Sequence, residues 1–158
     1  MADFVFNIAK GRAVELADRV KNNDPSGAVL VVILLDSVNI ETDAVLMDKD
    51  TFSDVVSGAT NEAANGGYAR KILTDADLAA IPAPDDTNNR NERDIPDQTF
   101  AAVAAGNGIA KVVVCYDPVA GSGTDADLIP LTCHDYAMTP DGSDLIVQID
   151  PLGFLRAA

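Results

Sequence analysis

Residues 108–130 constrain the fold most strongly, because they predict a buried strand, a polar turn and the start of a second strand. Residues 109–116 are apolar apart from Lys111 and rich in β-branched side chains, which is typical of a strand covered on both faces. Asp117-Pro118 ends this strand, since proline has no backbone N–H to continue a ladder. Residues 128–132 then begin the return, which favours an antiparallel arrangement.

A second continuous apolar run, residues 28–35, predicts another buried strand. The run is too short and too rich in β-branched residues for a convincing helix. Weaker strand patterns follow at residues 68–73, 98–105 and 145–149. We expect the core to centre on side chains of these strands, namely Val29, Val31, Ile33, Leu35, Val112, Val114 and Ile146.

Two turn sequences predict hairpins, because Asn-Gly and Asp-Gly pairs adopt the tight turns that join antiparallel strands. Asn107-Gly108 lies between residues 98–105 and residues 109–116. Asp141-Gly142 connects residues 145–149 to the strand-like residues before it. We expect the segments on either side of each turn to pair with each other.

Helical patterns are few and short. Residues 8–20 repeat apolar side chains at three- and four-residue steps, which predicts an amphipathic helix. Thr42 can cap one further turn, and residues 50–57 form a second capped segment that is followed by a glycine. Residues 81–97 contain prolines, asparagines and many charged side chains, so they predict a long surface loop or an irregular strand.

Together these patterns predict a single domain over residues 1–158 of the mainly β (α+β) class. We expect an antiparallel β-sandwich or barrel-like domain with a short N-terminal helix and one or two helical turns. Residues 1–12 are expected to form an N-terminal arm, because apolar and polar side chains alternate at its start.

The charge of the chain excludes one class of partner. The 158 residues include 25 Asp and Glu against 11 Lys and Arg, which gives a net charge of −14. Phosphate backbones are bound by Lys and Arg, so the composition predicts no nucleic-acid partner. No apolar run approaches the roughly 20 residues of a membrane-spanning helix, and no signal-peptide pattern opens the chain. We therefore expect a protein made in the cytoplasm with no membrane partner.

No constellation of residues predicts catalysis. His134 is the only histidine and Asp135 follows it, but adjacent residues of a strand face opposite ways, so they are not a preformed dyad. Cys115 and Cys133 lie in apolar runs, which favours buried thiols over a disulfide or a nucleophile. We expect a protein that is not an enzyme and uses no cofactor.

Two further patterns are weaker. Residues 121–124 contain glycines and hydroxyls but precede a strand, so they predict a turn and not a phosphate-binding loop. Two groups of carboxylates offer oxygen ligands for Ca²⁺ without EF-hand spacing, and we favour solvated loops over a bound cation. These groups are Asp85, Asp86, Asp94 and Asp97, and Asp125, Asp127, Asp141 and Asp144.

Short strings along nearly the whole chain carry a family resemblance. They include Gly67-Tyr68-Ala69-Arg70-Lys71, Asp94-Ile95-Pro96-Asp97-Gln98-Thr99, Cys115-Tyr116-Asp117-Pro118, His134-Asp135-Tyr136, and residues 7–12, 123–132, 139–144 and 153–157. In these strings the chain resembles small virion-associated proteins of tailed bacteriophages.

The resemblance implies a non-enzymatic virion protein, namely a head decoration or cement protein that binds the outer capsid surface and stabilises the shell. Its implied location is the capsid exterior after synthesis in the bacterial cytoplasm. The implied partners are the major capsid protein and neighbouring copies of the chain, for example in a trimer. A tail- or fibre-associated binding module is the alternative, and it would use the loop at residues 81–97.

The N-terminal segment is the predicted partner-binding site. Apolar side chains near a chain end are hard to order unless something docks against them, and two cations here suit an acidic partner. The residues concerned are Phe4, Phe6, Ile8, Lys10 and Arg12. The competing prediction is that Phe4 and Phe6 pair as an edge strand within their own domain.

Overall fold

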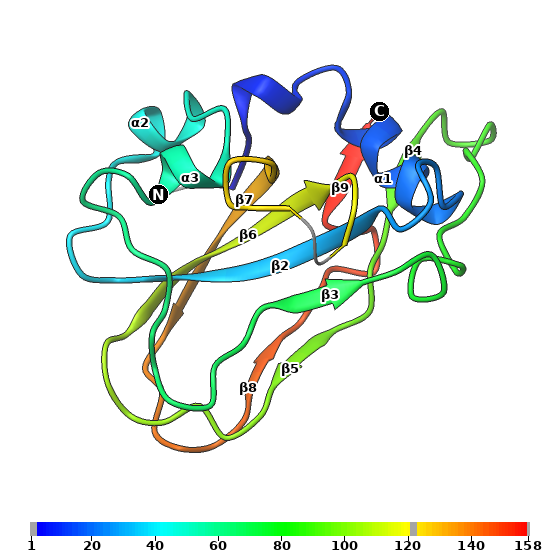
Figure 1. The fold of residues 1–158 in the computed structure, drawn as a ribbon. Coiled ribbons are helices and arrows are strands. Elements are labelled where there is room, and N and C mark those ends of the chain that lie inside the picture. The colour runs from blue at the N-terminus through cyan, green and yellow to red at the C-terminus, as the bar shows by residue number, and fades with distance from the viewer. Residues whose placement is uncertain (1–2, 121–122, 158) are drawn as a thin grey trace.

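A computed structural model describes residues 3–120 and 123–157. Its centre is an antiparallel sheet of five strands in the order β1-β7-β6-β2-β3 (Figure 1). These strands are β1 (Phe4–Val5), β2 (Val29–Asp36), β3 (Lys71–Leu73), β6 (Ile109–Asp117) and β7 (Ile129–Met138). The prediction of a mainly β, antiparallel domain with few helices is confirmed.

Strands β2 and β6 form the middle of the sheet, and every residue of both is buried. They pair antiparallel, with Val32 opposite Val114 and Ile33 opposite Val113. A strand covered on both faces gains nothing from polar alternation, which is why the sequence is apolar at nearly every position. The two strands predicted with the clearest patterns are therefore present with almost the predicted bounds.

Other elements cover the sheet from different sides. Helices α2 (Asp43–Met47) and α3 (Phe52–Val55) lie over one face, and the ribbon of β5 (Gln98–Phe100) and β8 (Leu145–Val147) lies over the other (Figure 1). Helix α1 (Ala13–Lys21) lies at the end of the sheet where β2 begins. It packs there beside a second ribbon, formed by β4 (Asn91–Arg93) and β9 (Leu155–Ala157).

Both predicted hairpins are wrong in their pairing. Strand β5 pairs with β8, with Thr99 opposite Ile146, although β6 follows β5 in the chain. The two connecting turns lie side by side, because Val103 N–H donates to the Ser143 carbonyl and Gly142 N–H donates to the Val103 carbonyl. Turn residues thus fix where the chain bends, but burial decides which strands pair.

The core agrees with the prediction at all positions but one. The six predicted residues of β2 and β6 are each at most 2% exposed. Ile146 is 51% exposed, so its assignment to the core is wrong. Its neighbours Leu145 and Val147 point into the protein instead, because a strand of three residues buries its two ends when it lies over a sheet.

The helix predicted at residues 8–20 is interrupted. A 3₁₀ turn, η1 (Asn7–Ala9), is followed by Gly11 with φ of +82°, and α1 begins only at Ala13. A positive φ is easily adopted by glycine and ends a right-handed helix. The segment at residues 81–97 is mostly exposed, as predicted, but it includes the short strand β4 and buries Arg93 and Ile95.

Candidate functional site

The predicted partner-binding residues divide into a buried and an accessible group. Strand β1 pairs with β7 at the edge of the sheet, with Phe4 opposite Cys133, and Phe6 is fully buried in the core. This arrangement is the one that the competing edge-strand prediction described. Lys10 is exposed, whereas Ile8 and Arg12 are partly buried, so the accessible part of the segment lies beyond β1.

A groove of about 550 Å³ lies beside these accessible residues. Its floor and walls are mainly apolar, and Lys10 and Arg12 stand among them. The remaining lining residues are Val5, Ala9, Gly11, Ala13, Val14 and Leu155. The groove therefore joins the turn before α1 to the end of the chain, since Leu155 belongs to β9. Gly11 supplies the turn between the two cations.

The cations of the groove differ from most others in the protein because no described carboxylate forms an ion pair with them. Lys10 Nζ donates to Asn7 Oδ1 at 2.6 Å and contacts Met47 Sδ at 3.6 Å. Arg12 Nε is buried and finds no hydrogen-bond acceptor among the described residues.

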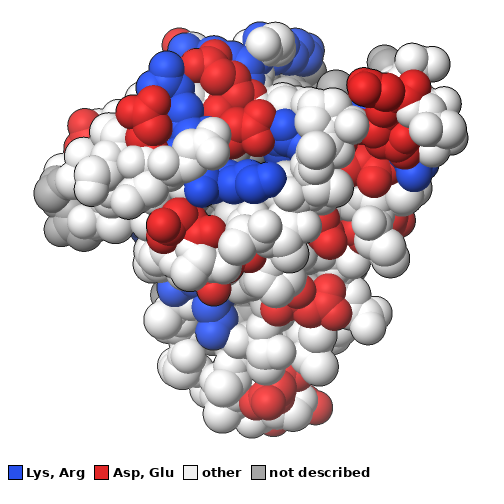
Figure 2. All heavy atoms as spheres, turned by 90° about the vertical axis from the view of Figure 1, so that its right-hand side faces the viewer, with Lys and Arg blue, Asp and Glu red and all other residues white. Residues whose placement is uncertain are grey.

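Figure 2 shows the end of the molecule that carries α1, β4 and β9. Most of its basic side chains gather in the upper half, interleaved with acidic ones.

A second pocket, of about 620 Å³, lies on the sheet beside the chain after β8, and His134, the only histidine of the sequence, lines it. His134 does not pair with Asp135. Its Nδ1 lies 3.3 Å from Asp3 Oδ2, and its Nε2 lies 2.9 Å from Thr132 Oγ1. This order of groups resembles a hydrolase triad, but the Thr132 residue is 1% exposed and does not line the pocket. A substrate in the pocket would not reach that hydroxyl.

The Asp3 carboxylate belongs to the same arrangement, and the sequence offered no signal for it. Burial opposes its charge, but the backbone N–H of Asp135 and the His134 ring outweigh burial and lower the pKa of Asp3. Only the register of β1 against β7 brings these residues together. Their polar contacts fasten β1 to the sheet.

Both cysteines are free and buried on the neighbouring strands β6 and β7. Burial raises the pKa of Cys133 to about 12 and raises the pKa of Cys115 well above its usual value. A thiol that remains protonated is a poor nucleophile, so neither residue is arranged for attack.

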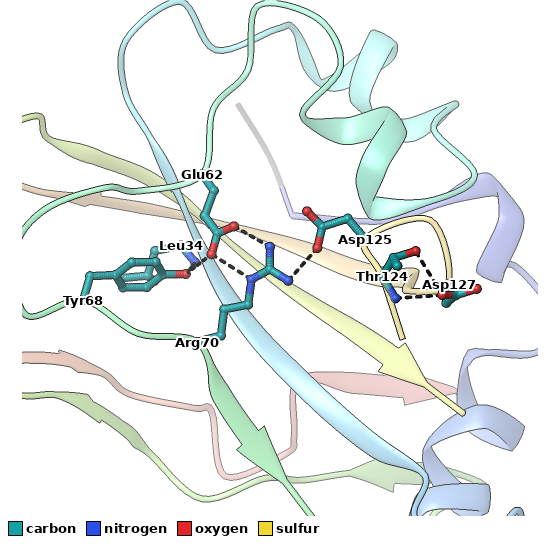
Figure 3. Close-up of polar contacts among 7 residues, drawn as sticks. All are labelled: Leu34, Glu62, Tyr68, Arg70, Thr124, Asp125 and Asp127. Atoms are coloured by element: carbon teal, nitrogen blue, oxygen red, sulfur yellow. Dashed lines mark hydrogen bonds and ion pairs between the residues drawn. The ribbon is translucent and has the colours of Figure 1, made fainter. Parts of the chain in front are cut away.

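A cluster around Arg70 joins three distant parts of the chain (Figure 3). Arg70 Nε donates to Glu62 Oε1 at 2.9 Å and Nη1 donates to Asp125 Oδ1 at 2.7 Å, while the guanidinium lies over the Phe52 ring. The Tyr68 hydroxyl donates to Glu62 Oε1 and accepts from the backbone N–H of Leu34 in β2. Each of these polar side chains has a partner within the cluster, so the cluster acts as a structural clamp.

The other features considered from the sequence are the two carboxylate groups, the glycine-containing turn and a membrane-spanning helix. No group of His, Cys, Asp and Glu within residues 3–120 and 123–157 is arranged to hold a metal ion, which includes the two carboxylate groups considered for Ca²⁺. Thr124 and Asp127 form a turn, whereas Gly121 and Ser122 of the predicted turn lie outside the described residues. None of the helices in the described part of the chain has the length and apolar composition to cross a bilayer.

Comparisons with known proteins add no relative. No protein-family model, curated protein or solved structure matches the chain.

Proposed function

We propose that the protein is a structural component of a tailed-phage virion, a decoration or cement protein that binds the outer surface of the capsid. The resemblance of several sequence strings to small virion proteins motivates this function. The observation that carries it structurally is the groove beside Lys10 and Arg12. It is an accessible apolar surface on a protein of net charge −14, and no described carboxylate forms an ion pair with its two cations.

The physical requirements of such a protein fit this fold. A decoration protein acts by contact area and does not change shape, and its partners would be the major capsid protein and neighbouring copies of itself. The central strands β2 and β6 are buried on both faces and supply a rigid body. The strongly acidic surface keeps free copies soluble before they bind a shell.

Co-sedimentation tests the proposal. The purified protein is mixed with shells that lack it and, separately, with isolated tails of the phage whose genome encodes it, and each mixture is pelleted. We expect saturable binding to shells and increased resistance of the shells to heating. Binding to tails alone would favour the tail-associated module instead, and binding to neither would contradict a virion role.

A further inference from the structure

We propose that the groove between the start of α1 and β9 is a docking site for an extended segment of a partner protein in which carboxylates alternate with apolar side chains. The inference rests on the proposed function only for the identity of the partner. The chemistry of the occupant follows from the groove itself.

Charge is the first argument. The chain has 25 acidic and 11 basic residues, and six of the basic side chains form an ion pair with a described carboxylate. The cations at the centre of the fold have such neighbours: Arg70 pairs with Glu62 and Asp125, and Lys111 pairs with Asp43 and Asp135. Lys10 and Arg12 have none among the described residues, like Lys21, Lys71 and Arg156, but these two cations line the same groove. A carboxylate from another molecule complements both.

Desolvation is the second argument. Arg12 Nε is shielded from water and finds no acceptor among the described residues, which leaves a charged group without one of its hydrogen bonds. An unsatisfied donor of this kind costs free energy, and a partner recovers that cost when the guanidinium turns its Nε toward the groove and the partner supplies an acceptor. A carboxylate is the acceptor that guanidinium groups bind best, often through two parallel hydrogen bonds.

Shape and polarity are the third argument. The lining of the groove other than its two cations is apolar, with Val5, Val14 and Leu155 as its largest members. A volume of about 550 Å³ accommodates a few side chains and not a folded element. A segment with a carboxylate for the cations and leucine-like side chains for the walls therefore matches the groove better than a purely acidic segment.

Nuclear magnetic resonance titration of the full-length, isotope-labelled protein tests the inference. The probe is a short capped peptide of alternating aspartate and leucine, and its control has asparagine in place of aspartate. We expect the acidic peptide to shift the backbone amides of Gly11, Arg12, Val14 and Leu155, and the neutral peptide to bind at least about fivefold more weakly. Added salt should weaken only the acidic peptide.

Variants assign the effect to the groove. K10E should raise the Kd of the acidic peptide by about fivefold or more, whereas K71E, the same charge reversal at the opposite edge of the sheet, should change it less than about twofold. R12Q should weaken the peptide as well, and its melting temperature confirms that the variant is folded. Equal binding of both peptides, or equal effects of K10E and K71E, would overturn the inference.

The remaining outcomes separate this inference from the proposed function. If shells bind the protein but the acidic peptide does not, the inference fails and the proposed function stands. If the acidic peptide binds the protein but neither shells nor tails bind it, the proposed function fails. Amide shifts that follow protein concentration without any peptide would identify a second copy of the chain as the occupant, and they would overturn the assignment to an acidic partner.

Discussion

Lys111 is the residue on which burial and charge compete most directly. Its side chain is fully buried in β6, with Nζ 2.6 Å from Asp135 Oδ1 and 2.9 Å from Asp43 Oδ1, and it lies beside the Phe4 ring. Burial opposes the charge of the ammonium, but the hydrogen bonds to Asp135 and Asp43 outweigh burial and raise the pKa of Lys111. The residue therefore joins α2 and β7 across the sheet.

Truncating Lys111 should be costly. We expect Lys111→Ala to lower the free energy of unfolding by about 3–5 kcal/mol, because it leaves two carboxylates facing each other and opens a cavity. Lys111→Met fills the space and should cost less, since both aspartates remain partly exposed to water. Urea denaturation measures both variants, and equal stabilities of the alanine variant and the parent would refute this role.

Asp94 should make stability depend on pH in the opposite sense to most carboxylates. Partial burial and the neighbouring Asp97, Asp150 and Glu92 raise the pKa of Asp94. Its ionisation therefore costs stability as pH rises through this raised pKa, and the cost is absent below the ordinary value of about 4. We expect Asp94→Asn to raise the free energy of unfolding at neutral pH by about 0.5 kcal/mol or less, with no gain in acid.

Asp127 provides a control of opposite sign for this measurement. Hydrogen bonds from the Thr124 backbone N–H and hydroxyl lower the pKa of Asp127. The stability that it contributes is present above its ordinary pKa and is lost as pH falls through the lowered one. Asp127→Asn should therefore destabilise at neutral pH. Melting curves of both variants between acid and neutral pH measure these effects. The assignment is contradicted if both substitutions change the melting temperature at neutral pH in the same direction.

Strands β2 and β6 are the elements on which the domain depends. We expect Ile33→Ala and Val114→Ala each to lower the free energy of unfolding by about 1–4 kcal/mol, because both side chains are buried at the centre of the sheet. Ile146→Ala, on the exposed side of β8, is the matched control and should stay within about 0.5 kcal/mol of the parent. A costly Ile146→Ala would show that β8 buries the opposite face.

Strand β1 belongs to the domain and is not a free arm. Deleting residues 2–7 removes β1 together with Phe6, so we expect a loss of roughly 3–6 kcal/mol, comparable to exposing two phenylalanine side chains. K10E leaves β1 in place and should keep the parental melting temperature. A deletion variant that melts with the parent would restore the interpretation of this segment as an arm.

Sequence reasoning succeeded for elements whose signal is local. A continuous β-branched run identifies β2 and β6, and the capped segment at residues 50–57 contains α3, whose Thr51 and Asp54 form a capping box. It failed for strand pairing and for the choice of which side chains of a short strand such as β8 point inward. Both depend on which distant segment packs against each face of the strand. The candidate site shows the same division: Lys10 and Arg12 were predicted, but Leu155 reaches the groove only through the fold.

At the scale of the whole molecule, the uneven charge distribution links stability to the proposed function. The internal cations, Arg70, Arg93 and Lys111, pair with carboxylates that hold distant segments together. Lys10 and Arg12 form no ion pair with a described carboxylate, and a partner at the groove would supply the opposite charge. A shell that carried an acidic, partly apolar strip would therefore bind this protein in one orientation, and neighbouring copies would meet through surfaces away from the groove.

The Tyr68 hydroxyl also has a consequence for long-term solubility. Strand β3 pairs only with residues 30–32 of β2, so the rest of that apolar strand would present an open edge if the chain at residues 61–68 did not occupy it. Open apolar edges recruit further strands and start fibrils. Tyr68→Phe would leave the Leu34 N–H unpaired, and we expect the variant to develop thioflavin fluorescence on storage well before the parent. The clamp thus protects the protein against self-association through this edge.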